Sequence, residues 1–143
     1  MPDDFLDRQN VEERETGWAK TIKEAPGNLL VAVRPDSGIL GFVCHGRVTG
    51  TPRVAGYQAQ IFGLHVCPEG KRQGVGLQLM RAAFVRLSSL PCRNAYVLTL
   101  EGNEPARRFY EKLGGREVAR GLVSFGGRDL VEVAYGWERL ELP

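Results

Sequence analysis

Residues 68–80 read PEGKRQGVGLQLM, and the hydrophobic pattern of the chain changes inside this stretch. Before it, QIFGLHV at residues 60–66 is a short apolar run of strand length. After it, from Leu77 onward, apolar residues recur about every 3.6 positions, as they do on one face of a helix. The stretch therefore predicts a glycine-rich turn that leads from a strand into a helix.

This turn has two interpretations. Gly74 and Gly76 allow the backbone to adopt positive φ angles and to approach a ligand closely. Successive N–H groups and the positive end of the following helix then face one anion, and Lys71 and Arg72 add charge nearby. The same residues also suit an ordinary strand-to-helix turn with solvated basic side chains.

Of three known phosphate-binding patterns, two are excluded here. A P-loop needs Ser or Thr after Gly-Lys, but Arg72 follows Lys71. A Rossmann fingerprint needs a small residue where Leu79 stands. The third pattern is Arg/Gln-x-x-Gly-x-Gly/Ala between a strand and a helix, often with a valine and a proline just upstream. The residues that match it, with lysine in place of the usual Arg or Gln, are Val66, Pro68, Lys71, Gly74 and Gly76.

The rest of the chain alternates between strand and helix patterns. Strands are predicted at residues 29–33, 39–47, 60–66, 95–100, 117–125 and 128–137, and helices at 11–28, from 77 to about 90, and 103–113. The order predicts a mixed α/β fold in one domain, residues 1–143. Antiparallel strands come first, a parallel strand-helix-strand core follows, and a hairpin ends the chain.

The composition favours a globular protein without metals or disulfides. The chain has 143 residues, of which 43% are hydrophobic and 25% charged, with a net charge of +2. That charge is too small to indicate nucleic-acid binding, and such a reading rests only on the KR and RRF pairs. Cys44, Cys67 and Cys92 have no metal-binding spacing. No run approaches the roughly 18 apolar residues of a membrane span, and the acidic start MPDDFLDRQ does not resemble a signal peptide, so we expect a cytoplasmic protein.

A second motif lies at residues 103–115, NEPARRFYEKLGG, directly after the predicted strand 95–100. Asn103 suits the N-cap of a helix, Pro105 its first turn, and Gly114 the position just past its end. The spacing from Asn103 to Gly114 is Asn-x-x-Ala-x-x-x-Tyr-x-x-x-Gly. Two spaced motifs on the expected elements are far more specific than either alone.

Taken together, residues 29–137 resemble the GNAT N-acetyltransferase superfamily, which uses acetyl-coenzyme A. The ending, in which GGRDLVEVAYGW follows ARRFYEKLGG, resembles a common bacterial branch of it. The resemblance implies a mixed sheet with helices on both faces. It also implies transfer of an acetyl group from acetyl-CoA to a primary amine of a small molecule or peptide.

The resemblance further implies where the cofactor binds. The pantetheine arm of acetyl-CoA would add to the strand 60–66 like an extra strand, and the pyrophosphate would lie on the amides that follow it. The implied cofactor-binding residues are Leu64, His65, Val66, Lys71, Arg72, Gln73, Gly74, Val75, Gly76, Leu77, Asn103, Ala106 and Tyr110.

Two residues are the candidates for catalysis. Tyr110 matches the general acid of the family, because a phenol can protonate the thiolate that leaves; it also suits an ordinary core aromatic beside Phe109. Many members carry a glutamate as base where this chain has Gln60, which cannot take a proton at neutral pH but can hold a water. His65 and Glu101 are weaker candidates for the base.

The front of the chain departs from the family pattern. The first strand and first helix of the family are expected to be absent, which would leave a sheet edge uncovered, and such an edge invites a homodimer. Together with Gln60, this departure favours an alternative function, that of a non-catalytic acyl-CoA-binding protein with a regulatory or structural role.

Overall fold

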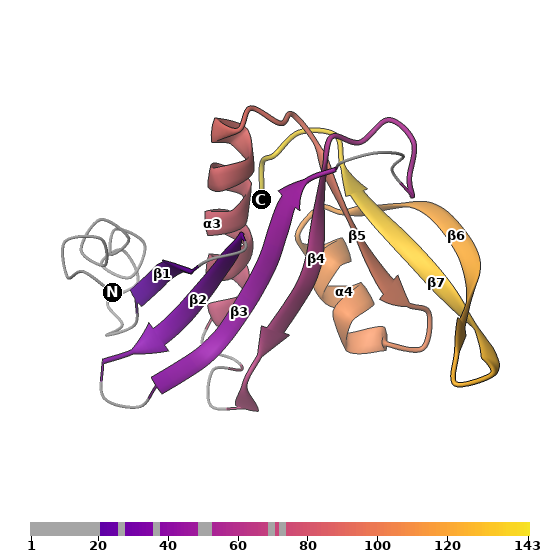
Figure 1. Ribbon diagram of the computed structural model, residues 1–143, viewed down its shortest axis with the longest axis horizontal. Coiled ribbons are helices and arrows are strands. Elements are labelled where there is room, and N and C mark those ends of the chain that lie inside the picture. The colour runs from indigo at the N-terminus through magenta and orange to yellow at the C-terminus, as the bar shows by residue number, and fades with distance from the viewer. Residues whose placement is uncertain (1–20, 26–27, 36–37, 49–52, 69–70, 72–73) are drawn as a thin grey trace. The chain divides into compact units, whose positions relative to one another are not determined.

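A computed structural model describes residues 21–25, 28–35, 38–48, 53–68, 71 and 74–143. Within these residues lie one seven-stranded mixed sheet and two helices (Figure 1). The strand order is β1-β2-β3-β4-β5-β7-β6. The elements are β1 (Thr21–Ala25), β2 (Leu29–Arg34), β3 (Gly38–Arg47), β4 (Ala59–Val66), α3 (Val75–Ser89), β5 (Ala95–Leu100), α4 (Glu104–Lys112), β6 (Arg116–Phe125) and β7 (Arg128–Trp137). The mixed α/β fold predicted from the sequence is confirmed.

The chain forms two compact units. The first comprises Met1–His45 and Gly63–Arg86, and the second comprises Gly46–Phe62 and Leu87–Pro143. Strands β3 and β4 and helix α3 each contribute residues to both units. Neither of the described helices combines the length and the apolar character that crossing a membrane requires.

In the first unit, antiparallel strands β1, β2 and β3 carry a buried apolar face. Leu30 on β2 and Val43 on β3 are fully buried, as is Leu79 on α3. Gly41 on β3 lets the backbone of β3 lie close to the end of β4. A Cβ at this position would stand 2.6 Å from the carbonyl oxygen of His65. The close approach holds the last residues of β4 against β3, directly before the turn that leads to α3.

The helix predicted at residues 11–28 is corrected by the structure. Residues 11–20 lie outside the described part of the chain, but residues 21–25 form β1, whose register with β2 runs from Thr21↔Val33 to Ala25↔Leu29. The side chain of Ile22 is buried in that position, and Asn28 adopts a φ of 60° where the hairpin returns. Burial and strand pairing thus outweigh the helical preference of the local sequence.

Strand β1 also changes the argument about the sheet edge. We expected the shortened front of the chain to leave an edge strand missing, but β1 covers the outer side of β2 and comes first in the strand order of the residues that the structure describes. An uncovered β2 therefore no longer supports a homodimer, and dimerisation stays a prediction without a structural argument.

The second unit is built around β5. Its residues Tyr96 and Val97 pair in parallel with Gln60 and Ile61 of β4, as predicted, and β5 runs antiparallel to β7 along all six of its residues. Tyr96 is fully buried. The continuous apolar pattern of β5 thus reflects a strand with neighbours on both sides.

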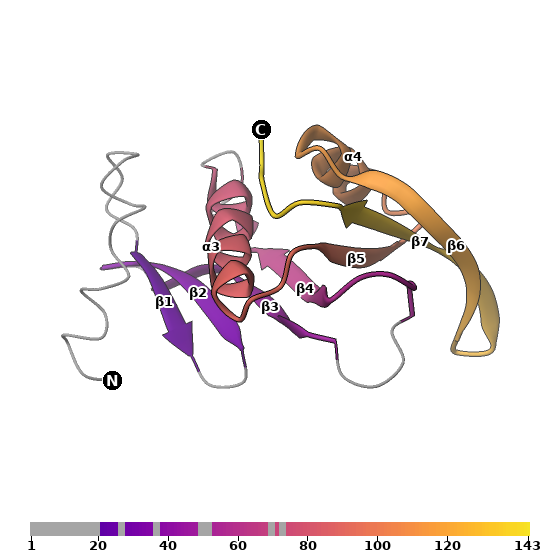
Figure 2. The same ribbon diagram turned by 90° about the horizontal axis from the view of Figure 1, so that it is seen from above.

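Helix α4 packs against β7 in the same unit (Figure 2). Asn103 caps it, since its Oδ1 accepts a hydrogen bond from the N–H of Ala106 at 3.3 Å. Gly114, with a φ of 90°, follows the C-cap. The indole N–H of Trp137 on β7 then donates to the carbonyl of Leu113 at 3.0 Å. Both predicted ends of α4 are confirmed.

Candidate functional site

Gly74, the residue directly before α3, has a backbone conformation that suits an anion-binding turn. Gly74 is exposed and has a φ of 75°, a left-handed conformation that glycine adopts without strain. The N–H of Gln78 donates to the carbonyl of Gly74 at 3.0 Å. The amides of Val75, Gly76 and Leu77 stand in the first turn of α3, where backbone N–H groups have no partner within the helix and suit an oxyanion.

The charges around this turn agree with that role. The first turn of α3 contains no acidic residue, and Lys71 is exposed. The side chain of Val75 is buried, which anchors the start of the helix. The predicted contacts of Arg72 and Gln73 lie outside the described residues.

The last residues of β4 lead into this turn. Leu64 and Val66 are half-buried and His65 is exposed. On one edge this end is held by β3, where the N–H of Cys67 donates to the carbonyl of Leu40 at 2.8 Å. The imidazole of His65 lies 5.6 Å from the ring of Phe42, a packing contact that gives no support to His65 as a base.

Tyr110, the candidate acid, lies in the second unit within an aromatic cluster. Its ring centroid is 5.5 Å from that of Phe109, 6.2 Å from Tyr135 and 6.1 Å from Trp137. Burial raises the pKa of the Tyr110 hydroxyl to about 12, so the phenol keeps its proton at neutral pH. The hydroxyl of Tyr135 is already committed, because it donates to Glu111 at 2.8 Å and accepts from Arg107 at 3.1 Å.

The raised pKa of Tyr110 predicts a loss of stability in alkali. The phenol has a pKa of about 10 in the unfolded chain and about 12 in the folded protein, so the unfolded state binds fewer protons between these values. The contribution of this phenol to the free energy of unfolding is complete below pH 10. It is lost as the pH rises toward 12, by about 1.4 kcal/mol per pH unit. Urea unfolding from about pH 9 to about pH 11.5 should show this slope in the wild type relative to Tyr110→Phe. Parallel curves for the two proteins would contradict it.

Gln60 is held by Tyr96, a partner that the sequence did not indicate. Its Oε1 accepts a hydrogen bond from the hydroxyl of Tyr96 at 2.8 Å, and that hydroxyl accepts from the backbone N–H of Arg53 at 3.3 Å. The amide group of Gln60 remains as a donor to a water. A buried tyrosine needs a hydrogen-bond partner. The tyrosine at position 96 in an apolar strand was therefore the feature of the sequence that could have indicated such a bond.

Glu101 and Asn103, which follow β5, are engaged in local contacts. The carboxylate of Glu101 pairs with Arg120 at 2.5 Å, and its backbone carbonyl accepts from Arg107 at 3.2 Å. The ion pair favours a structural role for Glu101 over that of a base. Asn103 uses its oxygen as the cap of α4, which leaves its amide nitrogen as a donor, and Ala106 is half-buried beside it.

The fold and these motifs define an acetyltransferase of the GNAT type, and comparison with known proteins agrees. The pattern that describes the Acetyltransferase (GNAT) family matches residues 2–115. The chain therefore belongs to this family. The predicted family, the predicted enzyme class of N-acetyltransferase and acetyl-CoA as the acetyl donor are thereby confirmed.

Individual relatives support the same assignment. The Bacillus subtilis (strain 168) uncharacterized N-acetyltransferase YuaI is 26% identical over 141 residues, which are 98% of this chain and 78% of that protein. Arabidopsis thaliana NAA60, solved with a bisubstrate analogue, has a TM-score of 0.62 at 20% identity, covering 96% of this chain and 94% of that one. A candidate streptothricin acetyltransferase from Bacillus anthracis, solved with acetyl-CoA, has a TM-score of 0.65 at 20% identity, covering 76% and 60%.

Proposed function

We propose that this protein transfers the acetyl group of acetyl-CoA to a primary amine of a small molecule or a peptide. The observation that carries the proposal is the turn at Gly74, which offers the amides of Val75, Gly76 and Leu77 at the start of α3 in a chain of this family. An acyl-CoA pyrophosphate is an anion suited to such a turn.

The residues proposed to bind acetyl-CoA fall into two groups. In the first unit, the backbone of Leu64, His65 and Val66 would pair with the pantetheine arm. The amides at residues 72–77 and the side chain of Lys71 would bind the pyrophosphate. In the second unit, Asn103 offers its amide N–H to the arm and Ala106, with its small side chain, leaves space.

The proposed chemistry is direct attack of the neutral amine on the thioester carbonyl. The C–N bond forms, the C–S bond breaks, and Tyr110 gives its proton to the departing sulfur. Its high pKa keeps this proton in place until the thiolate develops. A water held by the side-chain amide of Gln60 takes the proton of the amine and passes it to bulk solvent. Bulk solvent then gives a proton back to the Tyr110 phenolate.

The alternative is a non-catalytic acyl-CoA-binding protein. The observation that favours it is that position 60 carries a glutamine and not a glutamate. A carboxamide cannot accept the proton of the amine, and the carboxylate of Glu101 is paired with Arg120. The aromatic packing of Tyr110 also suits a purely structural role.

Thiol release distinguishes the two functions. Acetyl-CoA is incubated with the protein and a panel of primary amines and short peptides with free N-termini, and free CoA is measured with a thiol reagent. We expect CoA release that depends on the amine, with the acetylated product identified by mass spectrometry. Tight CoA binding by calorimetry without release above background on any amine would support the non-catalytic alternative.

A further inference from the structure

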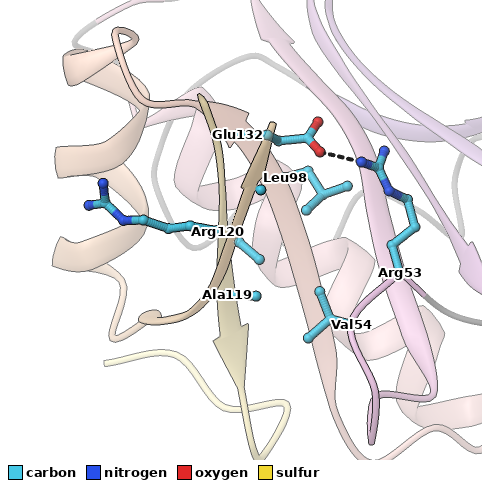
Figure 3. A pocket seen from close by; sticks show the side chains of 8 residues that line it. Arg53, Val54, Leu98, Ala119, Arg120 and Glu132 are labelled. Carbon is cyan, nitrogen blue, oxygen red and sulfur yellow. Dashed lines mark hydrogen bonds and ion pairs between the residues drawn. The ribbon is translucent and has the colours of Figure 1, made fainter. Parts of the chain in front are cut away.

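A pocket of about 90 Å³ lies on the second unit (Figure 3). Its lining comes from the loop that contains Arg53 and Val54 and from strands β5, β6 and β7. A volume of this size is enough for a small polar group of a ligand.

An ion pair crosses this pocket. The Nη2 of Arg53 lies 2.5 Å from Oε1 of Glu132 on β7. The side chain of Glu132 is only 15% exposed, whereas that of Arg53 is 58% exposed. Glu132 is therefore the shielded anchor, and the guanidinium is the group that the pocket presents to solvent.

The guanidinium of Arg53 has hydrogen-bonding capacity left. Among the described residues, its side chain has one hydrogen-bond partner, Glu132, which engages Nη2 alone. A guanidinium has five N–H donors in a planar fork, and Nη2 has a second N–H besides the one bound to Glu132, so one of the two-nitrogen edges, Nε–Nη2 or Nη1–Nη2, can receive both oxygens of a second carboxylate.

Arg120, the other arginine of the lining, is committed elsewhere. Its guanidinium pairs with Glu101 and with Glu117, each at 2.5 Å. Figure 3 shows its side chain extending away from Arg53. Arg53 is therefore the cation that this pocket offers to a ligand.

The remaining walls suit the binding of a charged group. Val54, Leu98 and Ala134 are apolar, and a hydrogen bond in such surroundings is less weakened by water. Gly121 stands opposite Glu132 in the β6–β7 register, and a Cβ built on it would meet no atom within 4 Å. The absence of a side chain there helps to keep the pocket open.

The pocket is connected to the proposed catalytic residues of the same unit. The backbone N–H of Arg53 donates to the hydroxyl of Tyr96, which in turn donates to Gln60. The residue that presents the guanidinium is thus tied through its backbone to Gln60, the residue proposed to hold the water that takes the proton of the amine.

We propose that Arg53 selects an acceptor that carries a carboxylate in addition to its primary amine. Arg53 binds the carboxylate through the two-nitrogen edge of its guanidinium that Glu132 leaves open, and Glu132 is the positioning residue that fixes the guanidinium. The proposal rests on the proposed acetyltransferase function and names its substrate class as small amino acids or acidic peptides.

Matched acceptors test the proposal. The probes are the amino acids from β-alanine to δ-aminovaleric acid, each compared with its own carboxamide. We expect the wild type to prefer at least one free acid, and Arg53→Gln to lower that preference in kcat/KM about tenfold to a hundredfold, mostly through KM. Arg53→Lys should keep part of the preference, and Glu132→Gln should weaken it. Arg108→Gln, which removes an exposed arginine of the same unit, is the control and should keep it.

Binding measurements keep the two hypotheses separate. If the wild type acetylates no amine, the proposed function fails, and calorimetric affinities for each acid and its carboxamide, measured with CoA present, still test the pocket. Tighter binding of an acid that is lost in Arg53→Gln supports the proposal. Equal affinities, or an unchanged preference in the folded Arg53→Gln variant, overturn it.

A second variant tests the pocket without touching its charges. Gly121→Val should narrow the pocket, because Gly121 lines it and a Cβ built there would meet no atom within 4 Å. We expect the preference for the acid to fall in this variant while thermal unfolding confirms that it is folded. A folded Gly121→Val protein with the full wild-type preference would place acid recognition outside this pocket and would overturn the proposal.

Discussion

Gly74→Glu should weaken the binding of CoA about a hundredfold or more, equivalent to about 2.7 kcal/mol. The new carboxylate would stand beside the amides of Val75 and Gly76, where the pyrophosphate is proposed to bind. Two unit charges 4 Å apart near a protein surface repel by about 4 kcal/mol, so even a screened interaction gives this loss. The φ of 75° at Gly74 adds strain for any side chain with a Cβ.

Two control variants separate charge from strain. Gly74→Asn introduces a neutral side chain that tolerates the left-handed conformation, and Gly74→Ala introduces the strain alone. Calorimetric titration with CoA should place both much closer to the wild type than the glutamate variant. If Gly74→Glu and Gly74→Asn bind CoA equally well, the turn does not hold the pyrophosphate.

Tyr110→Phe should lower kcat by about 10²- to 10⁴-fold, which is the usual contribution of a general acid. The phenyl ring keeps the contacts with Phe109, Tyr135 and Trp137, so the fold and the affinity for CoA should change little. Single-turnover measurements with acetyl-CoA and the best amine of the panel measure this effect directly, because they isolate the chemical step.

Tyr135→Phe is the matched control for this experiment. It removes a hydroxyl from the same aromatic cluster, one that contacts Arg107 and Glu111, and it should retain most of kcat. A Tyr110→Phe protein that binds CoA and turns over as fast as Tyr135→Phe would assign Tyr110 to the core and leave sulfur protonation to solvent.

Most of the fold was predictable because its strands have strong local patterns. The continuous apolar run of β5 and the hairpin strand β7 have the predicted bounds, and the cap and stop signals of α4 lie where Asn103 and Gly114 indicate. Residues 21–25 were predicted wrongly. Their place in β1 depends on pairing with β2, and a window of sequence that contains charged residues and an N-terminal cap signal cannot show this pairing.

The candidate site was predictable only where its residues belong to local motifs. The turn at Gly74 could be identified because glycine spacing and a following helix are visible in the sequence. The ion pair of Arg53 with Glu132 joins residues 79 positions apart, and the bond between Tyr96 and Gln60 joins residues 36 apart. Such partners come together through sheet order, and no local spacing encodes them.

The hydrogen bonds of Tyr96 bear on how this chain can evolve. Because the hydroxyl accepts from the N–H of Arg53, its own hydrogen points to the Oε1 of Gln60, and a glutamate has an oxygen in the same place. Glutamine and glutamate codons differ by a single nucleotide. The bond that holds Gln60 would therefore survive the mutation to the glutamate base implied by the family resemblance, so a lineage can gain or lose a carboxylate here without first rebuilding its surroundings.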